Sequence, residues 1–210
     1  MDPALVVAFV VAAFLLSVVP GPDMLFIVAN AAAGGRRAGL VSAVGVSTGL
    51  AVHTVAAAFG LSALIAAAPE ALVVIRVAGA VFLVYLAVSA WRAGRTDHER
   101  AAPEPRRSLR RLYAMATLTN LANPKVVLFY LAFLPQFLTH GAGAWPVAVQ
   151  LLALGAVFIV VGLSVDGTVG VAAGSFAETV LSRPAVQRRL QRASAVIFGG
   201  LAVRLALDSR

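Results

Sequence analysis

Lys125 is the only lysine in the chain, and it lies within a long apolar segment. A lone cation in such a place is costly, so it usually faces a cavity or a partner. Asn123 and Pro124 are typical of the N-cap and first position of a helix, whose positive end would lie beside the ammonium group. We therefore expect this segment, which also contains Asn120, to bind a carboxylate. The alternative is a structural lysine that snorkels or pairs with Asp23.

Asp23 is the natural counterpart of this cation, and it follows the prolines of the segment Pro20–Pro22. Proline removes a backbone donor, so a helix running up to Val19 must break here. A helix that restarts would have Gly21 near its N-cap and Pro22 at its first position. A helix break inside the membrane leaves backbone N–H and C=O groups without helical hydrogen bonds, which is tolerated only where protein or water covers them. We therefore predict that this segment lines a site. Asp23 would accept an ammonium group or carry a proton there, unless it only caps its own helix.

Four further polar residues lie in apolar segments. Asn30 lies about two turns beyond Asp23, where it could line the site or only join helices. His53 and Thr54 form a small polar patch in an alanine-rich segment, although a lone histidine there is often structural. Asp166 is expected towards the cytoplasmic end of its helix, where an interfacial position is the simpler interpretation.

Two pairs of glycines, Gly45 with Gly49 and Gly170 with Gly174, have the small-xxx-small spacing of closely packed membrane helices. Their lack of a side chain lets a neighbouring backbone approach. We interpret both pairs as packing positions and not as chemistry.

The composition is that of a polytopic membrane protein, with 60% hydrophobic residues, 12% charged residues and a mean hydropathy of +0.92. The formal charge of +8 could indicate nucleic-acid binding. The arginines fall between apolar runs, however, as they do in the cytoplasmic loops of membrane proteins. We therefore expect a lipid bilayer and no nucleic acid as partner. The N-terminus carries an acid where a secretory signal would be basic, which predicts a retained first span.

The chain lacks the sequence motifs of several enzyme classes. There is no cysteine, hence no disulfide and no thiolate metal site. There is also no nucleophile-elbow, nucleotide-binding or zinc-protease motif, so we expect no enzyme activity and no cofactor. A membrane hydrolase built on Ser47 and His53 would depend only on their proximity in sequence. Transport without a nucleotide motif would have to use an ion gradient or run downhill.

Six apolar runs reach about the 20 residues needed to cross the hydrocarbon core of a bilayer. They are Ala4–Ala33, Leu40–Ala67, Leu72–Trp91, Leu112–Leu138, Pro146–Val165 and the shorter Ala193–Leu207. The sequence therefore predicts an all-α membrane protein with six transmembrane helices.

The basic residues alternate between the predicted loops, and 13 of the 17 fall on one side. They are Arg36, Arg37, Arg92, Arg95, Arg100, Arg106, Arg107, Arg110, Arg111, Arg183, Arg188, Arg189 and Arg192. The opposite connections, 68–71 and 139–145, contain no lysine or arginine. Because cytoplasmic loops are rich in these residues, we expect both termini outside. Arg76 and Arg204 go against the pattern, which snorkelling would explain.

The segment 94–110 is the one clear break in composition, with two prolines and three acids among its arginines. We interpret it as a cytoplasmic linker within a single transporter domain, 1–210, whose halves are about 1–93 and 111–210. The three spans before the linker together take the chain from outside to inside, and the three spans after it take the chain from inside to outside. This arrangement predicts two inverted three-helix repeats. Pro22 and Pro124 would interrupt the first and fourth helices at corresponding positions.

Four segments carry a resemblance to a known family: PGPD at 20–23, GGRRAGL at 34–40, GLAVHTVAAAFGLSAL at 49–64 and TNLANPKVVLFYLAFLPQF at 119–137. They resemble the LysE/RhtB-type amino-acid exporters, the lysine exporter and homoserine/threonine resistance translocators. The last segment, 182–207, is similar to that family's end. The resemblance covers nearly the whole chain. The segment LSVDGTVGVAAG, 163–174, departs from it, with Asp166 where apolar or aromatic residues are commoner.

The resemblance implies secondary active efflux of amino acids or close derivatives across the bacterial cytoplasmic membrane, against protons entering the cell. It implies no particular amino acid, and it leaves open whether the protein forms a homo-oligomer. A zwitterion needs an anionic and a cationic partner, which Asp23 and Lys125 could supply. One alternative is a metal-ion exporter, for which Asp23, His53 and Asp166 are a thin ligand set. Another is a membrane scaffold, for which buried charges have no obvious use.

Overall fold

The structure is a computed structural model that describes residues 1–68, 70–93, 108–180 and 184–207. Its elements are α1 Pro3–Val18, α2 Pro22–Ala56, η1 Ala57–Leu61, α3 Ser62–Ala67, α4 Ala71–Ala93, α5 Leu109–Leu121, α6 Pro124–Leu128, η2 Phe129–Phe133, η3 Leu134–Phe137, α7 Val147–Val180 and α8 Pro184–Leu207. No strand occurs in these residues, so the predicted all-helical fold is confirmed. Most of the linker 94–110 and Arg183 lie outside the described residues, as do the side chains of Arg76 and Arg204.

The first helical segment is divided between α1 and α2. The Asp2 side chain caps the start of α1 by accepting a hydrogen bond from the Ala4 backbone N–H at 2.8 Å. After Val18 the backbone is extended at Val19 (ψ 119°) and at Gly21 (φ −144°, ψ −175°), and α2 begins with Pro22. Proline suits that position because its missing N–H would have no helical partner there.

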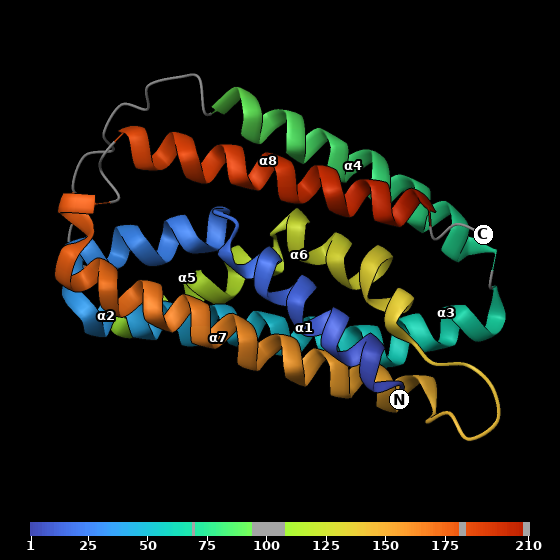
Figure 1. Cartoon of the computed structure of the whole chain (residues 1–210). Coiled ribbons are helices and arrows are strands. Elements are labelled where there is room, and N and C mark those ends of the chain that lie inside the picture. Colours follow the sequence, from blue (N-terminus) through green and yellow to red (C-terminus); the bar gives the residue numbers. More distant parts are fainter. Residues whose placement is uncertain (69, 94–107, 181–183, 208–210) are drawn as a thin grey trace.

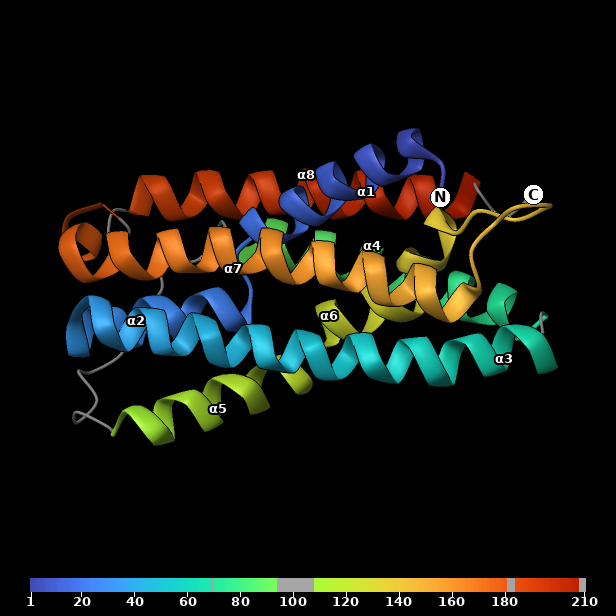
Figure 2. The ribbon, with the colours of Figure 1, turned by 90° about the horizontal axis from the view of Figure 1, so that it is seen from below.

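A second division separates α5 from α6. Asn123 has an extended backbone (φ −76°, ψ 108°), and its side-chain oxygen accepts a hydrogen bond from the Lys125 N–H at 3.0 Å. Asn123 is therefore the N-cap of α6, as predicted, with Pro124 at the first helical position. In Figure 2, both divisions lie part of the way along the bundle and not at its ends.

The range of α2 contains a sharp bend at Gly35, where φ is +75° and ψ is −175°. Residues with a side chain rarely adopt this φ, so glycine is the residue suited to the position. The chain reverses here, and the remainder of α2 runs back along the molecule towards α3 (Figure 2). The bend lies at the opposite end of the molecule from the start of α1 (Figure 1).

The helices form two groups that face each other. α4 and α8 lie side by side along one face, and α2 packs between α5 and α7 on the other, with α1 and α6 between the groups (Figures 1 and 2). Glycines allow the close packing of α2, because a Cβ on Gly39 would lie 2.5 Å from the Gly170 carbonyl oxygen. A Cβ on Gly45 would lie equally close to the Tyr113 carbonyl, so the packing role predicted for the glycine pairs is confirmed.

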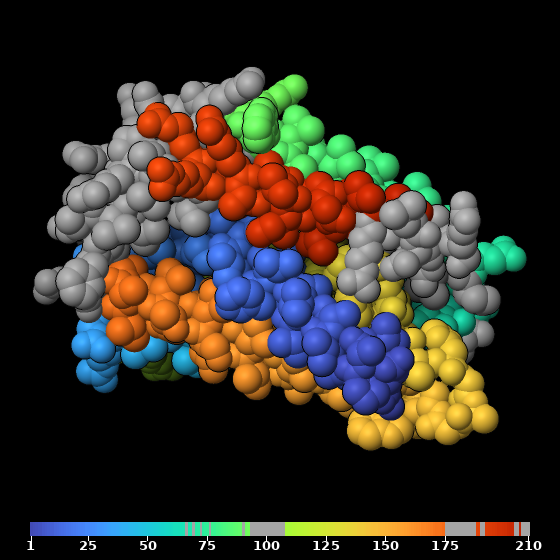
Figure 3. Space-filling view, viewed as in Figure 1, coloured from blue at the N-terminus to red at the C-terminus, as the bar shows by residue number. Residues whose placement is uncertain are grey.

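Aromatic rings fill the space between α1, η2, η3 and α7. The ring centroids of Phe129 and Phe158 lie 4.6 Å apart, and those of Phe9 and Phe137 lie 5.2 Å apart in an edge-to-face arrangement. In the space-filling view, α1 lies directly against α7 (Figure 3). Valines and aromatic residues such as Val74, Val81 and Tyr85 are exposed on the outside of the bundle, as expected for surfaces that face lipid.

Two stretches of the described chain are long and apolar enough to cross a membrane, Pro22–Ile65 and Val147–Gly174. Shorter apolar helices cover Pro3–Val18, Val73–Ser89, Pro124–Phe137 and Arg192–Val203. The predicted end of the fifth span at Val165 is wrong, because α7 continues to Val180. Its glycine-rich second half stays helical because it packs on α2, where a Cβ on Gly174 would collide with the Arg36 backbone. The last helix also begins earlier than predicted, at Pro184 and not at Ala193.

Candidate substrate site

Asp23 lies at the start of α2 and is only 7% exposed. Its Oδ2 accepts two hydrogen bonds of 2.8 Å, one from the Asn120 side-chain amide and one from the Asn123 side-chain amide. These donors come from the end of α5 and the N-cap of α6, about a hundred residues away in sequence. The carboxylate thus joins the two helix breaks, which the interpretation as a cap of its own helix did not foresee.

Two side-chain oxygens at this junction accept no hydrogen bond. Asp23 Oδ1 and Asn120 Oδ1 are both buried and have no hydrogen-bond partner. An unpaired buried polar atom typically costs about 1–3 kcal/mol, so such atoms need a reason. A ligand that donates hydrogen bonds would satisfy them.

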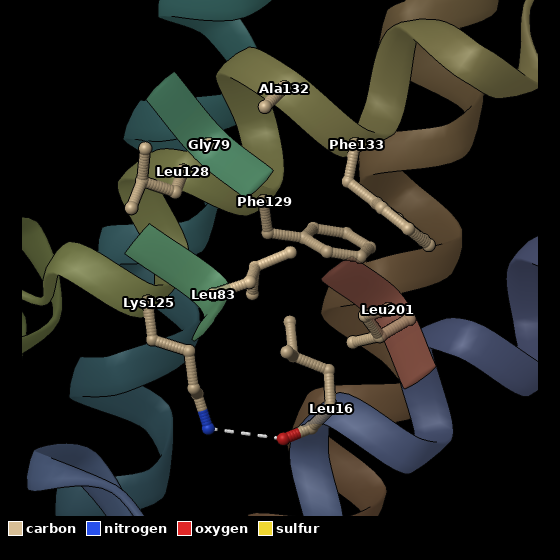
Figure 4. A pocket seen from close by; sticks show the side chains of 9 residues that line it. All are labelled: Leu16, Gly79, Leu83, Lys125, Leu128, Phe129, Ala132, Phe133 and Leu201. Carbon is tan, nitrogen blue, oxygen red and sulfur yellow. Dashed lines mark hydrogen bonds between the residues drawn. The ribbon is translucent and has the colours of Figure 1, made fainter. Parts of the chain in front are cut away.

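Lys125 reaches across the site to the end of α1. Its Nζ donates hydrogen bonds to the carbonyl oxygens of Leu16, at 3.0 Å, and Val19, at 3.1 Å. Figure 4 shows the ammonium group directed at Leu16, with the side chain packed beside an apolar cavity. A lysine ammonium has three donors, so one remains for a substrate.

Gly21 makes room for this lysine. A Cβ at position 21 would lie 3.3 Å from Lys125 Nζ and 3.6 Å from its Cε. A larger residue would push the ammonium away from the α1 carbonyls. The predicted site residues Gly21, Asp23, Asn120, Asn123 and Lys125 are therefore brought together by the fold, while Pro20, Pro22 and Pro124 shape the surrounding breaks.

No ion pair joins the described side chains of Asp23 and Lys125, so the structural pairing considered as the alternative role of this lysine is not observed. Lys125 is occupied by backbone carbonyls and Asp23 by amides. Both nevertheless line one cavity of about 30 Å³, whose other lining residues come from α1, α2, α5, α6 and α7. Ligand pockets usually measure about 300–1,000 Å³, so the structure has room for a few waters and not for an amino acid.

Asp166 lines the same cavity from α7. Its side chain is only 7% exposed and lies inside the helix bundle. Sequence reasoning also gave no role to Phe158 and Gly162, which lie on the same wall of the cavity.

His53 and Thr54 lie beside the site but do not line the cavity. His53 Nε2 is 3.5 Å from the Asn120 carbonyl oxygen, and its ring stacks on Tyr130 with a centroid distance of 5.5 Å. The Thr54 and Tyr130 hydroxyls are hydrogen-bonded at 2.8 Å. His53 thus contacts α5, which carries Asn120, whereas Thr54 contacts η2 through Tyr130, a polar residue that the sequence did not single out.

Asn30 is further away. Its side-chain amide donates to the Phe26 carbonyl oxygen of its own helix at 2.7 Å, and it is not among the residues that line the cavity. The structure thus does not bring it together with Asp23. Among the described residues, no group of three or more His, Asp or Glu side chains is arranged to hold a metal ion.

The site therefore combines an ammonium donor, a free carboxylate oxygen and a second carboxylate around a small buried space. These groups can bind a small molecule that has both charges. None of them is arranged as a nucleophile with a base.

Comparisons with known proteins agree with this description. The family model described as LysE type translocator matches residues 14–209. An uncharacterized membrane protein of Vibrio cholerae serotype O1 is 33% identical over 161 residues, which is 74% of each chain. No solved structure matches the chain significantly.

Two relatives from Salmonella typhimurium have names that state an activity. The homoserine/homoserine lactone efflux protein is 33% identical over 159 residues, 75% of each chain. The leucine efflux protein is 34% identical over 130 residues, 62% of this chain and 61% of that protein. The match to the leucine efflux protein thus spans less than two thirds of its length. The resemblance found in the sequence is confirmed: the chain belongs to the LysE type translocator family, a family of membrane proteins and not of enzymes.

Proposed function

We propose that this protein is a secondary active exporter of amino acids or close derivatives, driven by protons that enter the cell. The observation that carries the proposal is the shared cavity of Asp23 and Lys125, in which each group keeps unused hydrogen-bonding capacity. The named relatives, which export leucine and homoserine or its lactone, support the substrate class.

The two ends of an amino acid fit different parts of the site. The substrate carboxylate would accept the third hydrogen bond of the Lys125 ammonium group. The substrate ammonium group would donate to Asp23 Oδ1, which has no partner, and to Asn120 Oδ1 beside it. Each of these contacts involves a charge and is stronger than a neutral hydrogen bond.

Transport requires that this site opens to each side in turn. The present cavity is too small for substrate, so we assign the structure to a closed conformation. Two inverted three-helix repeats, with broken helices that meet at mid-membrane, supply the symmetry for such alternation. The divisions at Val19–Gly21 and Ala122–Asn123 support this arrangement, because each lies next to a charged residue of the site.

Asp23 is the group that we assign to proton coupling. With the site open to the outside, its free oxygen could take a proton, and with the site open to the cytoplasm that proton would be released before substrate binds. A proton and the substrate ammonium group would thus compete for the Asp23 carboxylate. This competition would couple the entry of a proton to the exit of a substrate molecule.

The arginine distribution supports a multi-pass protein of the bacterial cytoplasmic membrane with six spans, both termini outside and the linker 94–110 inside. The bend at Gly35, which precedes Arg36 and Arg37, lies at the end of the molecule opposite the start of α1 (Figure 1). This is the separation that the proposed topology requires.

Uptake into inverted membrane vesicles tests the proposed function. Such vesicles would accumulate labelled leucine or homoserine when respiration acidifies their interior, because outward transport in the cell is inward transport here. We expect a protonophore to abolish the accumulation. Vesicles that contain the protein but take up no amino acid beyond protein-free controls would contradict the proposal.

A further inference from the structure

We propose that exposed arginines at one end of the α4 and α8 pair bind the headgroup of an anionic phospholipid, and that the apolar surface next to them contacts its acyl chains. The arginines are Arg92 on α4 and Arg189 and Arg192 on α8, called here the arginine patch. The inference does not depend on the proposed function, because it requires a protein in a bilayer and no transport.

The two helices bring the arginine patch to one level of the bundle. α4 and α8 lie side by side and run in opposite directions (Figure 1). Leu83 of α4 and Leu201 of α8 line one small cavity. Arg92 follows Leu83 by nine residues, and on α8 Arg192 precedes Leu201 by the same number. Both arginines therefore lie about 14 Å from that cavity, towards the same end of the pair. Arg189 lies one turn from Arg192 on the same face of α8.

No carboxylate among the described side chains neutralises the arginine patch, whose three members are all exposed. Asp2 precedes α1 and Glu70 precedes α4, and both of these helices begin at the other end of the bundle (Figure 1). Asp23 and Asp166 are buried in the candidate substrate site. Cations held close together repel one another, so binding of an anion at the patch is favourable. Arginine suits a phosphate in particular, because its planar guanidinium group can donate two parallel hydrogen bonds to it.

The surface beside the arginine patch is apolar, which distinguishes a lipid from a soluble anion. Trp91, directly before Arg92, is 46% exposed, and tryptophan is enriched at the level of the lipid headgroups. Exposed valines continue from the patch along one face of each helix: Val84 and Val88 on α4, and Val196 and Val203 on α8. A phospholipid whose phosphate lies at the arginines would place its acyl chains on these valines. A soluble anion would use the arginines alone.

Native mass spectrometry of the purified protein tests the inference, with phosphatidylglycerol and phosphatidylcholine of the same acyl chains as the two probes. The glutamine variant is Arg92→Gln/Arg189→Gln/Arg192→Gln, which removes the charges of the patch. The lysine variant has lysine at the same three positions and keeps the charges. Glycerol phosphate, which is the headgroup chemistry without acyl chains, is added as a competitor.

The matched control is Arg37→Gln/Arg110→Gln/Arg111→Gln. It removes the same number of exposed charges from the same end of the molecule, but at the bend of α2 and the start of α5 (Figure 2). Thermal unfolding of each purified variant shows whether the fold is retained. If the glutamine variant does not fold, Arg192→Gln alone replaces it.

We expect the wild type to bind phosphatidylglycerol about ten times or more as tightly as phosphatidylcholine. Each arginine near a membrane surface contributes about fivefold to the binding of anionic lipid, so the glutamine variant should lose roughly a hundredfold and Arg192→Gln about fivefold. The lysine variant and the matched control should keep most of the preference. Glycerol phosphate at the concentration of the lipid should not displace it.

Three results would overturn the inference. Equal affinity of the wild type for the two lipids would show that the arginine patch selects no anionic headgroup. An equal loss in the glutamine variant and in the matched control would show that only net charge matters and that no site lies between α4 and α8. Displacement of the lipid by glycerol phosphate would show a site for soluble anions.

Discussion

The ammonium group of Lys125 lies 3.0 Å from the carbonyl oxygen of Leu16, so the cation at one helix break satisfies backbone that the other break leaves free. The last carbonyls of a helix have no partner within the helix and carry partial negative charge. Lys125 therefore has a structural task at the end of α1 as well as the proposed task of binding a carboxylate. The two tasks predict different measurements.

Lys125→Ala should abolish export and weaken substrate binding about ten- to a hundred-fold, because one charge-assisted contact of about 1.5–3 kcal/mol is lost. It should also lower Tm in the absence of substrate, because the Leu16 and Val19 carbonyls lose their donor. Both effects are visible in thermal unfolding with and without amino acid, since a ligand that binds the native state raises Tm.

Thr48→Val is a suitable control for this experiment. It removes the 2.8 Å hydrogen bond between Thr48 and Tyr113, which lies outside the cavity, and should leave the substrate-induced rise in Tm unchanged. If Lys125→Ala retained the full rise, the lysine would be structural only.

The helical fold could be predicted because its signals are local. Long apolar runs, proline at the start of α2 and α6, and asparagine at an N-cap all act within a few residues. The end of α7 could not be predicted in this way, because its glycines resemble a termination signal until their contact with α2 is known.

The composition of the site could be predicted only in part. Asp23, Asn123 and Lys125 stood out because polar residues in apolar segments are rare. Their partners could not be predicted, since the hydrogen bonds from Asn120 and Asn123 to Asp23 join separate segments. Asp166 also stood out as a polar residue in an apolar segment. Whether its side chain faces the cavity depends on how α7 packs against the other helices, which the sequence of α7 alone does not specify.

Gly49→Ala should destabilise the protein by about 1–3 kcal/mol, the usual cost of overpacking. A Cβ at this position would lie 2.5 Å from Asn120 Oδ1 and would displace the amide that holds Asp23. We therefore expect a lower Tm together with reduced transport. The control is Gly200→Ala on α8, where a Cβ meets nothing within 4 Å and alanine is the better helix former. Equal stability of the two variants would show that α2 and α5 do not pack as described.

The proposed orientation can be tested with single cysteines, because the chain has none. Arg100→Cys, in the arginine-rich linker, should resist an impermeant thiol reagent in intact cells and react after the cells are opened. Ala142→Cys, in the exposed loop before α7, should react in intact cells. Labelling with the reverse pattern would place the linker outside and both termini inside.

The central claim is that Asp23 links the movement of substrate to the movement of protons. Its most direct test compares wild type with Asp23→Asn in proteoliposomes with an imposed pH gradient and labelled amino acid. Asparagine has nearly the same shape, and its amide oxygen can still accept hydrogen bonds from Asn120 and Asn123. We expect the variant to exchange substrate across the membrane, with weakened binding, but not to concentrate it against a gradient. Full proton-driven accumulation by Asp23→Asn would contradict the account and place the coupling at another residue.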